Sequence, residues 1–159
     1  MNERDIFQAR RKAEKDIFLR VIGALPESRL DYKPHERSPS AQQILSTLIA
    51  EHASCASLVG TGRAEFVPAK PATVAEAAAA FERNWDDLDR KVEAMDPAAW
   101  DSSGQFFSGG KMVSEQQIGG FLWYILFDAV HHRGQLTTYI RPMGGKVPAI
   151  YGPSGDSRG

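Results

Sequence analysis

The sequence has a single cysteine, Cys55, among its 159 residues, and this scarcity excludes any intramolecular disulfide. A chain of this length can bury enough apolar surface to fold as one domain without covalent cross-links. An unpaired cysteine fits a reducing compartment, so we expect a cytoplasmic protein. On an apolar helix face a lone cysteine is most often a small buried hydrophobe, and a nucleophilic role is the less common alternative.

Neither sign of charge dominates, and no long apolar run is present. The formal net charge is −1, and the 19 Lys and Arg residues are spread along the chain, which argues against a dedicated nucleic-acid surface. The longest apolar stretch, Phe121–Phe127, is far shorter than the roughly 20 residues that cross a bilayer. The segment Met1–Asp16 lacks the apolar core of a signal peptide. We therefore expect no nucleic-acid or membrane partner.

Four segments have the apolar periodicity of amphipathic helices and are bounded by capping or helix-breaking residues. They cover about Asn2–Ala24, Ser40–Val59, Thr73–Met95 and Ser114–Ile140. The last three each begin with Ser or Thr followed three residues later by Glu or Gln, the pattern of a capping box. No segment has the pattern of a long strand. The sequence predicts an all-α four-helix bundle in a single domain, residues 1–159.

Two segments lack helical periodicity. Ala98–Val113 contains several aromatic residues and the pair Gly109–Gly110, and its length allows an irregular crossover between the third and fourth helices. The C-terminal tail, residues 142–159, is rich in Gly and Pro. We expect the tail to be irregular, with its few apolar residues packed on the bundle.

Asp128 and His132 are the most informative pair in the chain. They belong to one stripe of the fourth predicted helix, which comprises Phe121, Ile125, Asp128, His132, Gln135 and Tyr139. This stripe is expected to face the interior, where an unpaired charge costs several kcal/mol. One helical turn of separation allows both side chains to bind the same metal ion. The alternative is that Asp128 and His132 form a buried polar pair without a metal, either with each other or with Arg10 across the core.

The second predicted helix offers two candidates for a third ligand, Glu51 and His52, and helical projection places His52 nearer the apolar arc. Three nitrogen and oxygen ligands leave positions open for water or substrate, as in catalytic sites, and suit Zn²⁺, Ni²⁺ or Fe²⁺. Gln135 and Tyr139 would line the same cavity. His131 projects to the flank, where it would orient a carboxylate or lie in solvent.

Two segments resemble the DinB/YfiT-like superfamily: FDAVHHRGQLTTYIRPMGGKVPAIYGPS (127–154) resembles its fourth helix and tail, and LDYKPHERSPSAQQIL (30–45) its approach to helix two. The resemblance implies a four-helix bundle, often a homodimer, with a metal bound by a His of helix two and an H-x-x-x-H pair of helix four. Here the pair becomes Asp128 and His132, and a carboxylate at the first position is similar to the Glu of mycothiol-dependent relatives. The family's helix-two His aligns with Thr47, a poor ligand, so Glu51 or His52 would replace it.

The resemblance also implies an activity, because characterised members of the superfamily use low-molecular-weight thiols such as mycothiol or bacillithiol. It implies a metal-dependent hydrolase or thiol S-transferase that acts on a small-molecule electrophile, with zinc or nickel as the first candidate metals and iron as the third. The alternative is a non-catalytic, stress-related dimeric bundle that binds metal or ligand at a degenerate site, which Thr47 favours. A third alternative is a carrier of small apolar ligands. Leu122 and Leu126, off the core stripe, would supply a second apolar face for a homodimer.

Overall fold

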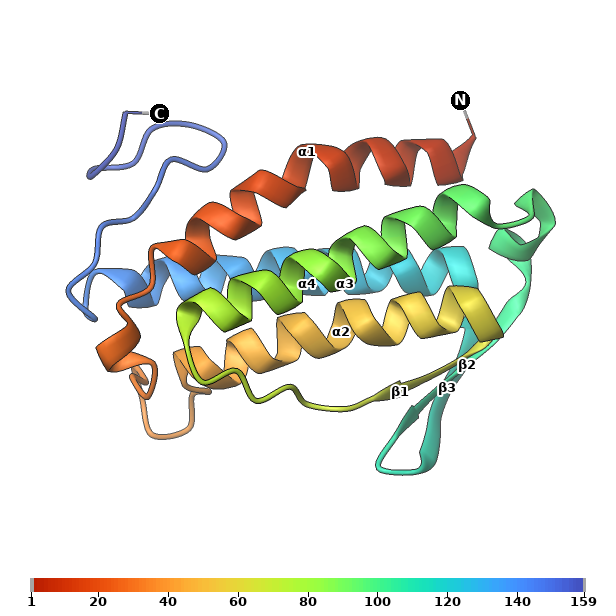
Figure 1. Ribbon diagram of the computed structural model, residues 1–159, viewed down its shortest axis with the longest axis horizontal. Coiled ribbons are helices and arrows are strands. Elements are labelled where there is room, and N and C mark those ends of the chain that lie inside the picture. The colour runs from red at the N-terminus through yellow and green to blue at the C-terminus, as the bar shows by residue number, and fades with distance from the viewer. Residues whose placement is uncertain (1, 159) are drawn as a thin grey trace.

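The computed structural model describes residues 2–158. Four long helices lie side by side, and a small three-stranded sheet covers one end of the bundle (Figure 1). The helices are α1 (Glu3–Gly23), α2 (Ala41–Thr61), α3 (Val74–Ala94) and α4 (Ile118–Ile140). Both α1 and α2 pack against α3 and α4. The predicted four-helix bundle is therefore confirmed as the main part of the fold.

The predicted ends of α2 and α3 agree with the structure because they depend on local hydrogen bonds. Ser40 and Gln43 form the expected capping box, in which each side chain accepts a bond from the other residue's backbone N–H. Gly62 ends α2 with a φ of 71°, a left-handed conformation that favours glycine. Thr73 caps α3, but the Glu76 carboxylate accepts a bond from the preceding backbone instead of completing a capping box.

The predicted start of α4 at Ser114 is wrong. Ser114 lies in strand β3 (Lys111–Gln117), which forms an antiparallel hairpin with β2 (Ser103–Ser108). Gly109 and Gly110 make the two-residue turn, and both have positive φ, as this tight hairpin turn requires. The helix itself begins at Ile118, with no side-chain cap. The S-x-x-Q pattern was misleading, because a strand accommodates the same residues.

The sheet corrects the expectation of an all-α fold. Strand β1 (Arg63–Phe66) follows α2 directly and pairs in parallel with β2, so the strand order is β1-β2-β3. The connection between α3 and α4 contains a short 3-10 helix, Pro97–Asp101, and the β2–β3 hairpin. It is therefore not the irregular crossover that was expected. Pairing with β1, which is distant in the sequence, stabilises strands whose own periodicity is weak.

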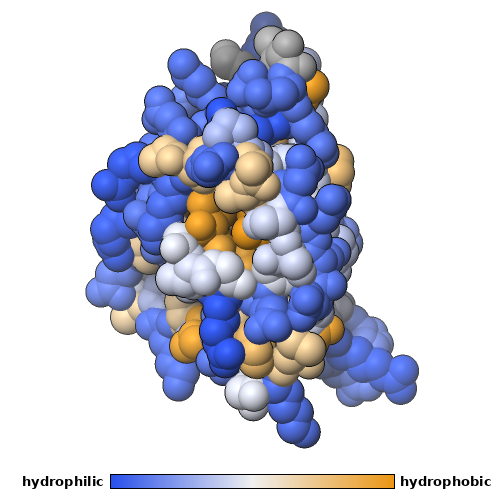
Figure 2. All heavy atoms as spheres, turned by 90° about the vertical axis from the view of Figure 1, so that its right-hand side faces the viewer, coloured by the Kyte–Doolittle hydropathy of each residue, from blue (hydrophilic) through white to orange (hydrophobic). Residues whose placement is uncertain are grey.

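The helix α2 is the central element of the core. By length and composition it is the one described helix that could cross a membrane, but most of its apolar window is buried inside the bundle. Figure 2 shows the end of the molecule that carries the sheet, where polar side chains cover most of the surface and apolar ones lie in a central hollow. The apolar character of α2 is thus explained by its position in the core.

The buried face of α4 is wider than the predicted stripe and is centred about one residue further along. Its buried positions include Phe121, Ile125 and Tyr139 of the stripe and also Leu122, Leu126, Ala129, Arg133, Leu136 and Ile140. Leu122 and Leu126 are only 1% and 2% exposed, so the proposal that they form a dimer face is wrong. Asp128, His132 and Gln135 are half-buried and lie at the edge of the core. Both flanks of α4 are apolar, so periodicity alone did not identify the flank that faces the other helices.

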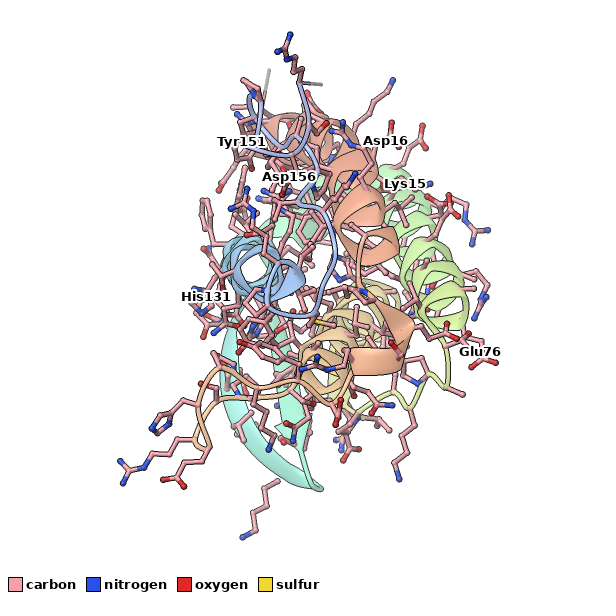
Figure 3. The ribbon with its side chains drawn as sticks, turned by 90° about the vertical axis from the view of Figure 1, so that its left-hand side faces the viewer. Lys15, Asp16, Glu76, His131, Tyr151 and Asp156 are labelled. Carbon is pink, nitrogen blue, oxygen red and sulfur yellow. The ribbon has the colours of Figure 1, made fainter. Side chains whose placement is uncertain are left out.

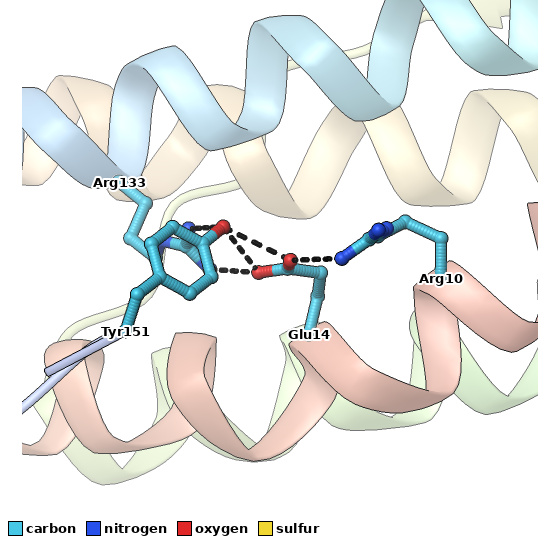
Figure 4. Close-up of polar contacts among 4 residues, drawn as sticks. All are labelled: Arg10, Glu14, Arg133 and Tyr151. Atoms are coloured by element: carbon cyan, nitrogen blue, oxygen red, sulfur yellow. Dashed lines mark hydrogen bonds and ion pairs between the residues drawn. The ribbon is translucent and has the colours of Figure 1, made fainter.

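The C-terminal tail contains no helix or strand within residues 142–158, as predicted, and lies across α1 and α4 (Figure 3). The Tyr151 hydroxyl donates to the Glu14 carboxylate of α1 and accepts a bond from Arg133 of α4 (Figure 4). Glu14 and Arg133 are each 2% exposed and form a buried ion pair. Arg10 Nη1, on the same helix, lies 3.9 Å from Glu14 Oε1, so Arg10 pairs with Glu14 and not with Asp128 or His132. The network attaches the tail to two helices.

Candidate metal centre

Glu51, Asp128 and His132 form a compact cluster at the contact between α2 and α4. Each side chain offers one ligand atom, and the three atoms lie within 4.8 Å of one another. His132 Nε2 is 3.5 Å from Asp128 Oδ2 and 4.0 Å from Glu51 Oε1. The helical turn between Asp128 and His132 aligns these two side chains, and helix packing adds the third from a distant part of the sequence.

Gln135 determines how the imidazole of His132 is presented. Its amide oxygen Oε1 lies 2.8 Å from His132 Nδ1. An amide oxygen only accepts hydrogen bonds, so Nδ1 carries the proton and donates it to this bond. The unprotonated Nε2 then faces the two carboxylates, the tautomer that metal-ligating histidines adopt. Gln135 therefore orients His132 from the next helical turn, consistent with its predicted place beside the site.

Glu51 is the most deeply buried residue of the cluster. Its side chain is 6% exposed, and its Oε2 atom is buried without a hydrogen-bond partner among the described residues. Burial, reinforced by the neighbouring Asp128 carboxylate, raises the pKa of Glu51 to about 9. A carboxylic acid in this position keeps its proton at neutral pH unless a cation replaces it.

The donor set fits a divalent cation. Ionised Glu51 and Asp128 with neutral His132 carry a combined charge of −2, which one divalent ion balances. The side chains of Asp128 and His132 are 34% and 19% exposed, so the cluster opens toward solvent on the α4 side. A buried oxygen without a partner, two carboxylates and one imidazole in this geometry are what an open, nitrogen- and oxygen-liganded metal site requires.

The structure places His52 outside this cluster. It is 1% exposed, stacks on Trp85 of α3 with a ring separation of 4.7 Å, and has its Nδ1 atom 2.8 Å from the Leu48 carbonyl oxygen. Burial lowers the pKa of His52 to about 3, so the ring is neutral. Helical projection correctly placed His52 on a buried side of α2, but that side faces α3. Thr47, at the family's histidine position, donates its hydroxyl to the Gln43 carbonyl.

The other candidate residues lie around the cluster. His131 is exposed on the outer side of α4 (Figure 3), with its ring 5.5 Å from that of His132. Tyr139 is buried at the far end of the stripe and donates its hydroxyl to the Pro39 carbonyl oxygen at 3.1 Å. Cys55 is 1% exposed, and burial raises the pKa of its thiol, which makes it a poor nucleophile. The thiol is therefore an inert part of the core.

Comparison with known proteins supports the same fold. A family model described as the DinB family matches residues 2–157. A solved DinB-like protein from Bacillus cereus ATCC 10987 is 17% identical, with a TM-score of 0.74, over 91% of this chain and 95% of that chain. A DinB-like protein from Bacillus subtilis is 15% identical, with a TM-score of 0.67, over 87% and 91%. No curated protein matches the chain.

Proposed function

The chain belongs to the DinB family, and from this premise we propose that Glu51, Asp128 and His132 bind a divalent cation that is used on a small-molecule substrate. The observation that carries the proposal is the three-residue cluster, in which a buried Glu51 oxygen lacks a partner. Zinc and nickel are the first candidates and iron the third, because imidazole and carboxylate ligands suit these ions.

The cluster has a buried side, formed by Glu51, and an exposed side, formed by Asp128. Glu51 anchors the ion from the buried face of α2, and Gln135 keeps the His132 Nε2 atom free of a proton. Asp128 is the most exposed ligand, so a substrate approaches from its side. A bound cation of this kind supplies Lewis acidity, which favours the thiolate of a bound thiol and polarises an electrophile.

The reaction that we propose is transfer of a low-molecular-weight thiol to an electrophile, with metal-dependent hydrolysis as the related alternative. Both reactions need an ion with free coordination positions, and three protein ligands leave such positions. Neither Cys55, which is buried, nor His52, which lies in the core, is available to act as a nucleophile or base toward a substrate. The chemistry is therefore assigned to the α2–α4 cluster.

Metal content is the first test. Untagged protein prepared without chelator is subjected to elemental analysis as wild type, Asp128→Ala, His132→Ala and His131→Ala. His131 is the matched control, since it is an exposed histidine next to His132 that is not part of the cluster. We expect about one equivalent of metal per chain in wild type and in the control, and loss in the other two variants. Wild type that stays empty after incubation with zinc or nickel would refute the proposal.

Thiol binding is the second test. The protein is loaded with Co²⁺, whose visible absorption changes when a thiolate joins its ligands, and is then titrated with a low-molecular-weight thiol such as bacillithiol. A new thiolate-to-cobalt absorption band in wild type, absent in His132→Ala, supports thiol transfer. One equivalent of cobalt with no spectral response to thiols would instead support the non-catalytic metal-binding bundle.

A further inference from the structure

A groove of about 380 Å³ lies between the β2–β3 hairpin and α4. Its apolar lining comes from Phe106 and Val113 of the hairpin and from Phe121, Tyr124 and Ile125 of α4. The rings of Phe106 and Phe121 lie 4.9 Å apart, and those of Phe121 and Tyr124 lie 6.5 Å apart, so one wall is a continuous aromatic surface. The volume falls within the range of small-molecule pockets.

The hairpin is shaped to contribute to this groove. Phe106 pairs with Ser114 and Phe107 with Met112, so Val113 is the extra residue of a β-bulge. A bulge re-directs the side chain of the extra residue and is often found beside functional sites. Val113 is 57% exposed and lines the groove, so its side chain is accessible to a ligand.

The groove is adjacent to the metal cluster. Ile125 lies three residues before Asp128 in α4, which corresponds to about 4.5 Å along the helix axis and nearly the same helix face. Phe121 occupies the same face one turn earlier. Residues that line the groove therefore lie within one to two helical turns of Asp128, the most exposed residue of the cluster.

We propose that this groove binds the apolar or aromatic part of the small-molecule substrate whose reacting group is placed at the Glu51–Asp128–His132 cluster. The inference rests on the proposed function and adds a substrate class to it: a molecule with an aromatic or branched apolar group joined to a thiol-reactive centre. The aromatic wall offers offset stacking to one ring. The bulged hairpin, rather than the helices alone, then selects the substrate.

A second groove provides an internal control. It has a similar volume of about 390 Å³ and lies between α1 and α4, where it is lined by Ile6, Trp123, Phe127 and Val130 among others. Trp123, Phe127 and Val130 lie on a different face of α4 from Asp128, at roughly 100° to 160° around the helix axis. A ligand in this groove is turned away from the cluster.

The test uses 4-fluorotoluene, a probe with no metal-binding group, observed by ¹⁹F NMR with Mn²⁺-loaded protein. A probe close to the paramagnetic ion is strongly broadened. We expect broadening in wild type and a reduction of about tenfold in Val113→Asp, because a carboxylate in the groove disfavours an apolar ligand. Tyr124→Asp is the second groove variant, and Phe127→Asp, in the other groove, is the matched control that retains the broadening. Broadening that survives both groove substitutions, or is lost in Phe127→Asp alone, would overturn the inference.

Saturation transfer from metal-free protein to the same probe separates this inference from the metal proposal. Transfer that depends on Val113 and Tyr124, in a protein that binds no Mn²⁺, would show an apolar ligand groove while refuting the metal site. Normal metal content with transfer that is insensitive to both groove substitutions would leave the metal proposal intact and refute the groove. Unchanged unfolding midpoints confirm that the variants are folded.

Discussion

Replacing Glu51 with Gln is expected to change stability in opposite directions in the metal-free and metal-bound protein. In the unfolded chain Glu51 has its ordinary pKa of 4.5, whereas burial and the Asp128 carboxylate raise the pKa to about 9 in the folded, metal-free protein. The folded state therefore holds a proton that the unfolded state releases. Because the folded pKa is raised, stability is greatest below pH 4.5 and falls as the pH rises toward 9. Glutamine has the same shape and no proton to hold.

The magnitude follows from this difference. One pKa unit corresponds to about 1.4 kcal/mol, so at pH 7 the buried carboxyl group costs wild type about 3 kcal/mol of unfolding free energy. At pH 5 the same cost is below about 1 kcal/mol. Glu51→Gln should recover these amounts in the metal-free protein. At a metal concentration 10,000 times the dissociation constant, wild type gains about 5 kcal/mol that a variant with a weakened site does not, which exceeds the roughly 3 kcal/mol that the substitution recovers at pH 7.

Urea unfolding, followed by circular dichroism, measures both effects. Wild type, Glu51→Gln and the control Glu93→Gln, an exposed carboxylate of α3, are compared at pH 5 and pH 7 with chelator and with saturating zinc. We expect the variant to be the more stable protein with chelator at pH 7 and the less stable one with zinc. The control should stay within about 0.5 kcal/mol of wild type. A variant that is destabilised with chelator at pH 7 would refute the assignment of Glu51 as a desolvated carboxyl group.

Three further predictions concern the core and the tail. Burial lowers the pKa of His52 to about 3 in the fold, so the free energy of unfolding decreases as the pH falls below 6.5. In a Glu51→Gln background, this contribution should change the free energy of urea unfolding by about 1.4 kcal/mol per pH unit between pH 6 and pH 4. His52→Phe should abolish it. Tyr151→Phe removes the hydroxyl that bonds the buried Glu14 and Arg133 and should cost about 1–2 kcal/mol. Tyr124→Phe is the control and should cost little, because Tyr124 is similarly exposed, 62% against 70% for Tyr151, and takes no part in this network; equal effects would contradict the network. A Cβ at Gly119 would lie 2.3 Å from the Trp100 ring, so Gly119→Ala should destabilise by about 1–3 kcal/mol in thermal unfolding. Its neighbour Gly120 has no atom within 4 Å of that position, and Gly120→Ala should stabilise α4 by up to about 1 kcal/mol.

The four helices could be predicted from the sequence because their signals are local. A capping box joins residues three apart, as Ser40 and Gln43 do, and a glycine such as Gly62 ends a helix through its own backbone conformation. The start of α4 could not be predicted in this way. Ser114 belongs to a strand whose stability depends on pairing with β2 and, through it, with β1, about fifty residues earlier in the sequence. The pair Gly109–Gly110 was the local signal for that hairpin.

The sequence by itself determined the part of the candidate site that lies on one helix. Asp128, His132 and Gln135 occupy successive turns of α4, so their proximity follows from helix geometry alone. The tertiary structure alone decided the third member. Glu51 and His52 are adjacent and project about 100° apart, and the position of α2 between α3 and α4 directs Glu51 to the cluster and His52 to Trp85. Periodicity shows that a side chain is buried, but packing between helices determines which side chain it meets.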